Sequence, residues 1–288
     1  MSNTRPDSPV VAAVEPSPRA DSVIAHATWA AVRLHRPLRL LHVVEPLAVP
    51  AVMMPDPAGT GPDTLMTAAL LDVERERSDR LRHEAMALFA ERGRELLAHE
   101  GLEVTAEERP GDLADVLDGL QSQTALLVIG KRGAEHPRDE RGHLGRQLER
   151  VLRTLHLPVL VAAHDFAVPN RALLAFDGSD HGRTLLRRAA EDPLLRGLPL
   201  DVAMVASGEQ ARAAVEAAAA SLRQAGHDAS ALLLDGGPGE ALPRRLHRVP
   251  GCLLVMGAFA HSRLRNLLLG STTTEVLRHC PSPVLVLR

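Results

Sequence analysis

A strand–loop–helix–strand pattern occurs twice in this chain of 288 residues. The second copy has the apolar run LLVMG at 253–257, then Gly270 before a helical pattern, then PSPVLVL. The first copy has LLVIG at 126–130, then Gly145 before a helical pattern, then LPVLVA. In both copies the glycine lies 13 residues ahead of the proline that opens the last strand (283 − 270 and 158 − 145). The chain is therefore a tandem repeat of one kind of domain.

The repeat sets the expected domain boundaries. Domain 1 covers residues 9–163 and domain 2 covers residues 171–288, with a disordered tail at 1–8 and a linker at 164–170. In each half, short apolar strands alternate with helical patterns, which is typical of a parallel sheet covered by helices on both faces. The expected fold class is α/β, with two tandem parallel-sheet sandwiches. Sheets of this kind bind ligands beyond the carboxyl ends of their strands.

The expected elements follow from the periodicity of the apolar residues. The repeat offset falls from 162 at the first strands (177 − 15) to 128 at the middle turns (239 − 111), so half two is 34 residues shorter (162 − 128). Most of this difference lies in a loop rich in Pro, Met and Gly at 45–63, which we interpret as a lid or as an insertion. The expected strands are 10–14, 38–44, 103–107, 125–129, 158–162, 172–176, 200–205, 230–234, 252–256 and 283–287, and the longest expected helix is 64–99.

Composition narrows the function classes. The formal net charge is −3 and aromatic residues make up only 2% of the chain, which argues against nucleic-acid binding because both a basic surface and stacking side chains are missing. The N-terminal MSNTRPDSP lacks an apolar signal-peptide core, and no run approaches the roughly 20 apolar residues of a membrane span. We therefore expect a cytoplasmic protein without membrane contact. Cys252 and Cys280 are expected to be reduced thiols, with a disulfide between them as the alternative.

Gly270 and the residues after it form the sharpest candidate site. Ser271, Thr272 and Thr273 open the helix, and small residues there leave backbone N–H groups accessible at the positive end of the helix dipole. A phosphate would bind well at such a helix start. The alternative is structural, because Gly is common in turns and Ser is a favoured N-cap.

Both halves resemble the universal stress protein domain. The resemblance covers nearly all of residues 9–288, and its most specific part is the ending VMG…LLLGSTTTEVLRHCPSPVLV; the segments FDGS at 176–179 and LHVV at 41–44 add to it. The resemblance implies a Rossmann-like α/β fold of adenine-nucleotide-binding type, expression linked to stress, and dimers built through the last strand. In the ATP-binding branch of the family, the motif is Gly, two residues, Gly, nine residues, Gly, then Ser or Thr.

Half two fits this motif with one departure. Gly257 and Gly270-Ser271 match its two ends, whereas Ala260 stands where the second Gly belongs. If that position needs a positive φ, the Cβ of Ala260 costs about 1 kcal/mol. The methyl group could also press against a phosphate that has to approach the backbone closely.

The resemblance also assigns three residues elsewhere in half two. Asp177 matches the acidic residue near adenine and ribose, Ala206 matches the backbone contact after the second strand, and Met256 precedes the loop. The structural alternative for Asp177 is a turn residue or a cap for the helix that follows.

Half one departs from the motif differently. Eleven residues (134–144) separate its second Gly from its third, Arg146 replaces the Ser or Thr, and Glu15 replaces the Asp. The longer Glu15 side chain could still reach a ribose hydroxyl, and the Arg146 guanidinium could itself meet a phosphate. Half two is therefore the favoured nucleotide site. The candidates in half one are Glu15, Val44, Gly130, Gly133 and Gly145.

These observations support an ATP-binding stress-response regulator in which the nucleotide acts as a conformational switch. Asp177 would bind the ribose or the adenine, and the backbone amides at Gly257 and Gly270 would bind the phosphates. Ser271 and Thr272 would donate further hydrogen bonds at the helix start. Any Mg²⁺ would enter with the triphosphate. Because no general base is placed to activate water, we expect a binding protein and not an enzyme.

Two alternatives use the same fold. One is a nucleotide-free interaction module, favoured by Ala260, by Arg146 and by the longer first loop. In this alternative the last strands, 158–162 and 283–287, mediate association, either as an intramolecular pseudo-dimer or as a homodimer. The other is an adenylating enzyme, but the chain has no HIGH-type or KMSKS-type motif.

The remaining polar residues have structural interpretations. The fourteen histidines show no metal-binding spacing, and His42 is expected to be a hydrogen-bonded core residue. The charged stretch 74–82 of the long helix is expected to be a solvated face with i,i+4 pairs. The sequence gives no support for a partner surface there.

Overall fold

The computed structural model describes residues 7–44, 62–131, 145–257 and 270–288, with the backbone alone for 62–71. Half one consists of β1 (Val10–Ala13), α1 (Ala20–Leu34), β2 (Leu38–Val44), α2 (Pro62–Leu96), β3 (Val104–Pro110), α3 (Leu113–Leu120), the 3₁₀ turn η2 (Gln121–Gln123), β4 (Leu126–Gly130), α4 (Arg146–Thr154) and β5 (Val159–Ala162). Half two consists of β6 (Arg171–Ala175), α5 (Asp180–Glu191), the 3₁₀ turn η3 (Pro193–Leu195), β7 (Leu200–Val205), α6 (Glu209–Gln224), β8 (Ala229–Leu234), α7 (Pro238–His247), β9 (Cys252–Gly257), α8 (Ser271–His279) and β10 (Val284–Leu287). Each strand expected from the sequence is present, with ends that differ by a few residues.

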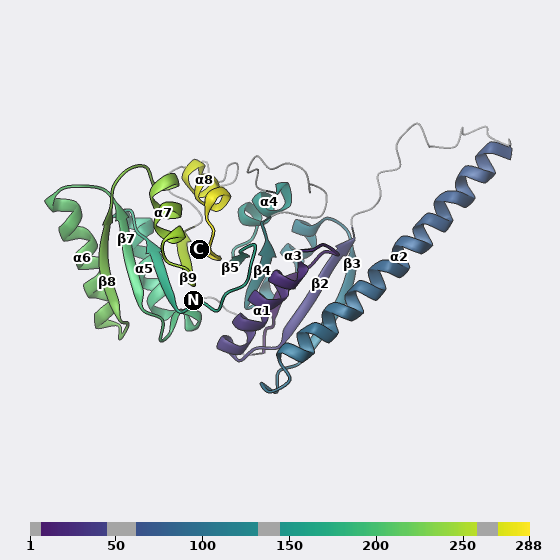
Figure 1. Cartoon of the computed structure of the whole chain (residues 1–288), viewed down its shortest axis with the longest axis horizontal. Helices are drawn as coiled ribbons and strands as arrows, with labels where there is room; N and C mark the ends of the chain where they lie inside the picture. Colours follow the sequence, from purple (N-terminus) through teal and green to yellow (C-terminus); the bar gives the residue numbers. More distant parts are fainter. Residues whose placement is uncertain (1–6, 45–61, 132–144, 258–269) are drawn as a thin grey trace.

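The ten described strands form one sheet, in the order β3-β2-β1-β4-β5-β10-β9-β6-β7-β8 (Figure 1). Neighbouring strands run parallel everywhere except at the centre, where β5 and β10 pair antiparallel with Leu160 opposite Leu285. The parallel α/β fold is confirmed, but the two expected sheets join into one. The last strands of the two halves pair within the chain, as the intramolecular form of the association hypothesis requires.

The sheet is covered on both faces, as the sequence predicts. Successive residues of a strand enter different apolar cores: Val10 and Ala12 of β1 belong to one, and Val11 belongs to the other. Helices α1, α2, α5 and α6 cover the first core, and α3, α4, α7 and α8 cover the second. Each core contains residues of β5 and of β10, so hydrophobic burial holds the two halves together across the central strand pair.

The structure corrects the alignment of the two halves. Val104 of β3 and Ala229 of β8 hold the same place, opposite the first residue of the second strand in each half. The offset there is 125 (229 − 104), so half two is 37 residues shorter (162 − 125) and not 34. The comparison of turns matched Gly111 with Gly239, but Gly239 belongs to α7, which begins at Pro238 because proline suits the first turn of a helix.

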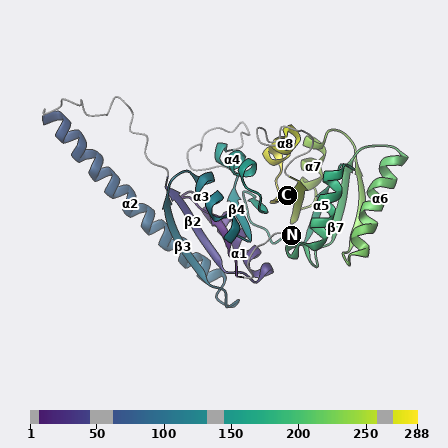
Figure 2. The ribbon, with the colours of Figure 1, turned by 180° about the vertical axis from the view of Figure 1, so that it is seen from behind.

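Most of the additional chain in half one lies between β2 and β3. The loop expected at 45–63 lies outside the described residues for 45–61, and its last two residues are the first two of α2. The α2 helix is therefore displaced toward the N-terminus, Pro62–Leu96 in place of 64–99. Seen from both sides, it extends beyond the sheet (Figures 1 and 2).

An arginine joins the two halves on the first-core side. Arg33, in the last turn of α1, donates hydrogen bonds to the carbonyl oxygens of Leu194 (3.0 Å) and Arg196. Its guanidinium also lies 5.8 Å from the centre of the Trp29 ring. The acceptors are available because Pro193 ends α5 early and the chain turns into η3, where the equivalent helix α1 continues.

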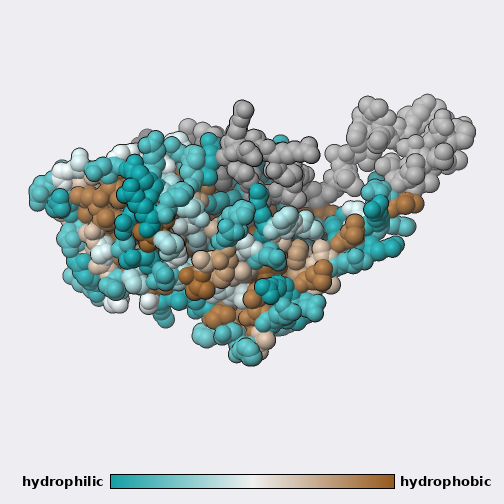
Figure 3. All heavy atoms as spheres, viewed as in Figure 1, coloured by the Kyte–Doolittle hydropathy of each residue, from teal (hydrophilic) through white to brown (hydrophobic). Residues whose placement is uncertain are grey.

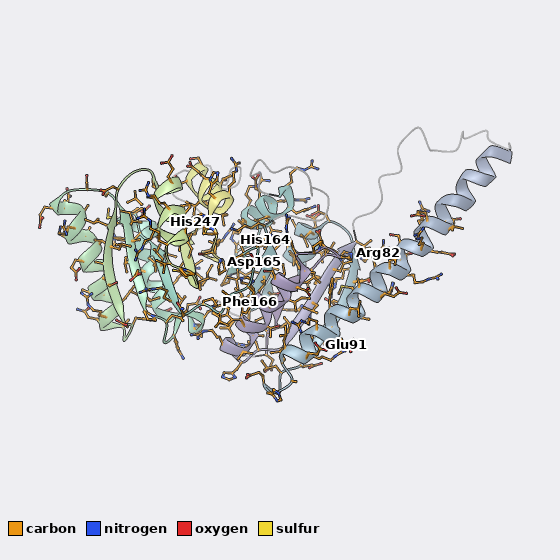
Figure 4. All side chains as sticks on the ribbon, in the orientation of Figure 1. Arg82, Glu91, His164, Asp165, Phe166 and His247 are labelled. Atoms are coloured by element: carbon orange, nitrogen blue, oxygen red, sulfur yellow. The ribbon has the colours of Figure 1, made fainter. Side chains whose placement is uncertain are left out.

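The linker between the halves is anchored to α1. The Ser22 hydroxyl donates to the carbonyl oxygen of Ala163 at 2.8 Å. Phe166 lies edge-on to the buried His26 ring at 4.9 Å, and Figure 4 shows it between the two halves. Burial lowers the pKa of His26, so the ring is neutral at neutral pH. The linker is therefore part of the packed structure and not a free tether.

We predict that Arg33→Ala lowers the free energy of unfolding by about 1–2 kcal/mol, because two hydrogen bonds from a charged donor between the halves are lost. Urea denaturation followed by circular dichroism measures this change. Arg188→Ala, at an exposed position of α5, is the control and should stay within about 0.5 kcal/mol. Equal effects of the two substitutions would contradict the role given to Arg33.

Both cysteines are free thiols inside the fold. Cys252 is 1% exposed and Cys280 is 4% exposed. Burial raises the pKa of both thiols, with the charge of Asp201 adding to the effect on Cys252, whose pKa reaches about 12. The reduced state expected from the sequence is the one in the structure.

We predict that neither thiol reacts quickly in the folded protein, because only a thiolate attacks a disulfide reagent. A pKa of about 12 leaves roughly one Cys252 thiol in 10⁴ ionised at about pH 8. Titration with DTNB should therefore find almost no reactive thiol before denaturation and two per chain afterwards. Rapid labelling of the native protein would show that the thiols are not held in these buried positions.

Candidate functional site

The strand order creates one ligand-binding edge in each half. β6 and β9 are neighbours, and the helices that follow them, α5 and α8, pack on opposite faces of the sheet. β1 and β4 relate to α1 and α4 in the same way. Where the chain leaves two neighbouring strands toward opposite faces of the sheet, at a topological switch point, a crevice opens at the carboxyl ends of the two strands. We call the point between β6 and β9 the half-two site and the point between β1 and β4 the half-one site.

The two sites are separate. Because β5 and β10 run antiparallel, the carboxyl ends of the two halves point toward opposite edges of the sheet at the junction. Each site must therefore be judged by the residues of its own half.

Asp177 lies at the half-two site, directly beyond β6, and is exposed. Its Oδ1 accepts hydrogen bonds from the backbone N–H of Ser179 (3.0 Å) and from the Ser179 hydroxyl (2.6 Å). Ser179 Oγ in turn accepts a bond from the N–H of Gly182 and caps α5. Asp177 thus supports the turn, as the structural alternative holds. Its Oδ2 receives no hydrogen bond from the described residues and can accept one from a ligand hydroxyl.

The start of α8 belongs to the same edge. Since β9 and β10 are parallel, the helix between them must run back from the carboxyl ends, which places its N-terminus at the half-two site. Gly270 is the N-cap, no side chain caps the helix, and no acidic residue lies in its first turn. The backbone N–H groups there suit an anion. Ser271 and Thr272 are exposed, whereas Thr273 is only 5% exposed, so its hydroxyl lies inside the fold.

The other candidates of half two lie around the ends of β7 and β9. Ala206 follows β7, and its N–H already donates to the carbonyl oxygen of Leu234 at 3.2 Å. Met256 is 6% exposed and packs in the second core, so it supports the site from behind. Gly257 is half-buried at the end of β9. Ala260 lies outside the described residues.

The half-one site has the same frame with different chemistry. Gly145 is the N-cap of α4, and its N–H donates to the carbonyl oxygen of Lys131 at 3.1 Å, which closes the base of the loop. Arg146 is exposed at the helix start, where half two has Ser271. Gly133 lies outside the described residues. Glu15, Val44 and Gly130 are half-buried near the ends of β1, β2 and β4.

The helix beside each site, α3 in half one and α7 in half two, is held by different contacts, which the sequence motifs did not predict. In half one, Asp112 caps α3 and forms an ion pair with Arg150 of α4. In half two the N-cap of α7 is Gly237, which has no side chain. Glu275 of α8, the counterpart of Arg150 (275 − 150 = 125), lies against Gly239 in the first turn of α7. Both arrangements place a carboxylate at a helix N-terminus, where it is favoured.

A contact between the two halves also lies at the half-one site. Lys131 follows β4, and its Nζ donates to the carbonyl oxygen of Cys280, the residue after α8. The helix that begins at the half-two site therefore ends against a lysine of half one. The sequence shows only a lysine after LLVIG, and this does not identify the carbonyl oxygen that accepts its hydrogen bond.

Other kinds of site find no support in the described ranges. No three His, Cys, Asp or Glu side chains there gather closely enough to hold a metal ion. No helix in those ranges has the length and apolarity to cross a membrane. His42 is 7% exposed and its Nδ1–H donates to the carbonyl oxygen of Val14 at 2.9 Å, so its predicted core role is confirmed.

The strand order and the two switch points define a tandem, doubly wound α/β protein. The model of the universal stress protein family matches residues 8–163 and again 169–288. The universal stress protein Slr1230 of Synechocystis is 33% identical over 270 residues, which cover 91% of this chain and 93% of the relative. The chain therefore belongs to the universal stress protein family and carries two of its domains.

Two solved structures that cover nearly all of this chain agree on its fold. A universal stress protein from Archaeoglobus fulgidus DSM 4304 covers 98% of this chain and 97% of its own, with a TM-score of 0.69 and 17% sequence identity. A putative universal stress protein from Pseudomonas aeruginosa covers 98% of this chain and 93% of its own, with a TM-score of 0.62 and 19% identity. A third structure, a universal stress protein in complex with cAMP, covers 42% of this chain with a TM-score of 0.37 and 25% identity.

We predict that Gly182→Ala disturbs the half-two site, because a Cβ there would lie 2.5 Å from Asp177 Oδ1 and 3.0 Å from the Phe176 ring. The free energy of unfolding should fall by about 1–3 kcal/mol in urea denaturation. Gly119→Ala in α3 is the matched control, since nothing lies within 4 Å of its added methyl group, and it should gain about 0.5–1 kcal/mol. Similar effects of the two substitutions would contradict the close packing at Asp177.

Proposed function

We propose that this universal stress protein is a stress-response regulator whose half-two site binds ATP. The observation that supports this best is the start of α8, which has no side-chain cap and no acidic residue in its first turn. It lies at the same strand edge as Asp177, one of whose oxygens still accepts a hydrogen bond. A donor set for phosphates and an acceptor for a sugar hydroxyl are what an adenine nucleotide requires.

The roles follow from the groups that remain available. The Oδ2 atom of Asp177 would accept a ribose hydroxyl. The N–H groups after Gly270, with the exposed hydroxyls of Ser271 and Thr272, would donate to phosphate oxygens. Any Mg²⁺ would arrive with the triphosphate, bound mainly by its oxygens. Thr273 would contribute through its backbone alone, because its side chain is buried.

The proposed switch uses the position of α8. A triphosphate bound at its N-terminus would draw the helix toward the end of β9. The same helix contacts α7 through Glu275 and ends at Cys280, whose carbonyl oxygen accepts the Lys131 bond from half one. A shift of α8 would therefore reach the surface of α7 and the junction between the halves.

We further propose binding without turnover. Asp177 is the acid assigned to the nucleotide in this arrangement, and one of its oxygens is held by Ser179 while the other is assigned to the ribose. Neither is then available to take a proton from an attacking water.

The rival is a nucleotide-free interaction module, which Ala260 and Arg146 favour. In this structure β5 and β10 pair with each other in the middle of the sheet, so neither offers a free edge to another chain. Association of two chains would therefore need a surface other than the last strands.

The first test is mass spectrometry of any small molecule released when the purified full-length protein is denatured, followed by calorimetric titration with ATP. We expect a dissociation constant in the micromolar range, about −8 kcal/mol. Asp177→Ala should weaken binding about tenfold or more, whereas Glu15→Ala in the half-one site should leave it unchanged. No released nucleotide and no heat up to about 1 mM ATP would refute the proposal.

A gain of affinity provides a sharper test. If the Cβ of Ala260 strains the loop or presses on a phosphate, Ala260→Gly should tighten ATP binding about fivefold, which corresponds to about 1 kcal/mol. Gly119→Ala, in α3 of half one, serves as the control for a general change in stability. Unchanged affinity in Ala260→Gly would show that this departure from the motif does not limit binding.

A further inference from the structure

The N-terminal part of α2 has no buried side chain among the described residues. The helix has 35 residues, about 50 Å at 1.5 Å per residue, and it projects past the sheet (Figures 1 and 2). Its buried residues, Met86, Ala90 and Gly93, all lie near its C-terminal end. From 72 to 85 no residue is buried. An isolated helix of this kind is only marginally stable in water, because most helical stability comes from packing one face.

A second apolar stripe runs along the exposed side of α2. Val73, Leu81 and Leu88 are 61%, 56% and 64% exposed. At about 100° per residue, all three lie about 140–160° around the helix from Met86, so they face away from the sheet. Figure 3 shows hydrophobic residues spaced along this protruding helix. Leu81 and Leu88 are one heptad apart, the spacing with which helices pack side by side.

Charged residues on the same face as the stripe can pair with charged residues of a second copy of α2. Arg77 and Glu84 lie on the same face as Leu81, about 180° and 160° from Met86. If two α2 helices pack antiparallel about the point between Arg80 and Leu81, residues whose numbers sum to 161 face each other. Arg77 then meets Glu84 of the second copy. A parallel pairing in register would instead place Arg77 against Arg77.

The same register pairs the apolar residues. Val73 of one copy faces Leu88 of the other, and Leu81 lies against the aliphatic stem of Arg80. Each contact occurs twice because the arrangement is two-fold symmetric. Because the stripe faces away from the buried side of α2, each folded body would lie on the far side of its own helix from the partner helix.

We propose that α2 is the surface through which two copies of this chain associate, as an antiparallel helix pair centred between Arg80 and Leu81. The partner is a second copy because the stripe is complementary to itself in both apolar and charged positions. The last strands of the two halves, β5 and β10, cannot join two chains because they are already paired inside one chain. The 37 additional residues between β2 and β3 of half one thus provide an interface that half two lacks.

Sedimentation velocity of the full-length protein, from about 1 to about 100 μM, tests the association. We expect a concentration-dependent dimer. The double variant Leu81→Glu/Leu88→Glu should be monomeric over this range with an unchanged melting temperature, because both side chains are exposed in the protomer. Val168→Glu, at a linker position that is 63% exposed, is the matched control and should remain dimeric.

A charge exchange tests the register. Arg77→Glu should weaken the dimer roughly tenfold, since two attractive pairs become repulsive. Arg77→Glu/Glu84→Arg should restore the wild-type affinity, which a nonspecific apolar contact would not do. Mixed Val73→Cys and Leu88→Cys chains should form a disulfide with each other under mild oxidation, whereas Val73→Cys chains alone should not.

Three outcomes would overturn the proposal. The first is a wild-type monomer at about 100 μM, including one that instead binds an unrelated protein through α2. The second is a dimer that survives Leu81→Glu/Leu88→Glu. The third is rapid crosslinking of Val73→Cys chains with one another, which would indicate a parallel pair.

Discussion

The antiparallel pairing of β5 with β10 joins the two halves into one sheet. Each half alone would leave its last strand as an open edge, with backbone N–H and C=O groups free to pair with any other strand. Their mutual pairing closes both edges and continues both apolar cores from one half into the other. It also points the carboxyl ends of the strands in the two halves in opposite directions, so the protein has two separate candidate sites.

The two halves have the same arrangement of strands and helices around their candidate sites and differ in the side chains there. At one helix start the chain has Ser271, and at the other it has Arg146. The helix beside each site is fixed by Glu275 in half two and by Asp112 with Arg150 in half one. These exchanges keep a carboxylate at the same helix N-terminus while changing the element that supplies it. In half two, by contrast, the first four residues of α8 carry no charged side chain.

The long helix of half one shows how an insertion can add a surface without altering a core. Among its described side chains only those of the last turns are buried: Met86 belongs to the first core, and Ala90 is buried as well. The earlier turns carry the exposed apolar residues Val73 and Leu81, together with charged residues that form ion pairs within the helix. The charged face that the sequence predicts is present, but its ion pairs, Arg75 with Asp72 and Arg82 with Asp79, are spaced i,i+3 and not i,i+4. A row of exposed leucines is present as well, and only the projection of the helix away from the sheet makes that row significant.

The elements, the tandem repeat and the parallel class of the sheet could be predicted from the sequence, because they depend on local periodicity. Apolar runs such as LLVIG and LLVMG form buried strands in both halves. Gly270 and Asp177 could be predicted as well, since turn and helix-start chemistry is local. The sequence left open whether β5 pairs with β10 within one chain or between two, and it did not predict that Thr273 is buried while Ser271 is exposed, or that Glu275 lies against Gly239. These outcomes depend on contacts between residues far apart in the chain. The same strand hydrogen bonds could form within one chain or between two, and only the packing of both halves selects between them.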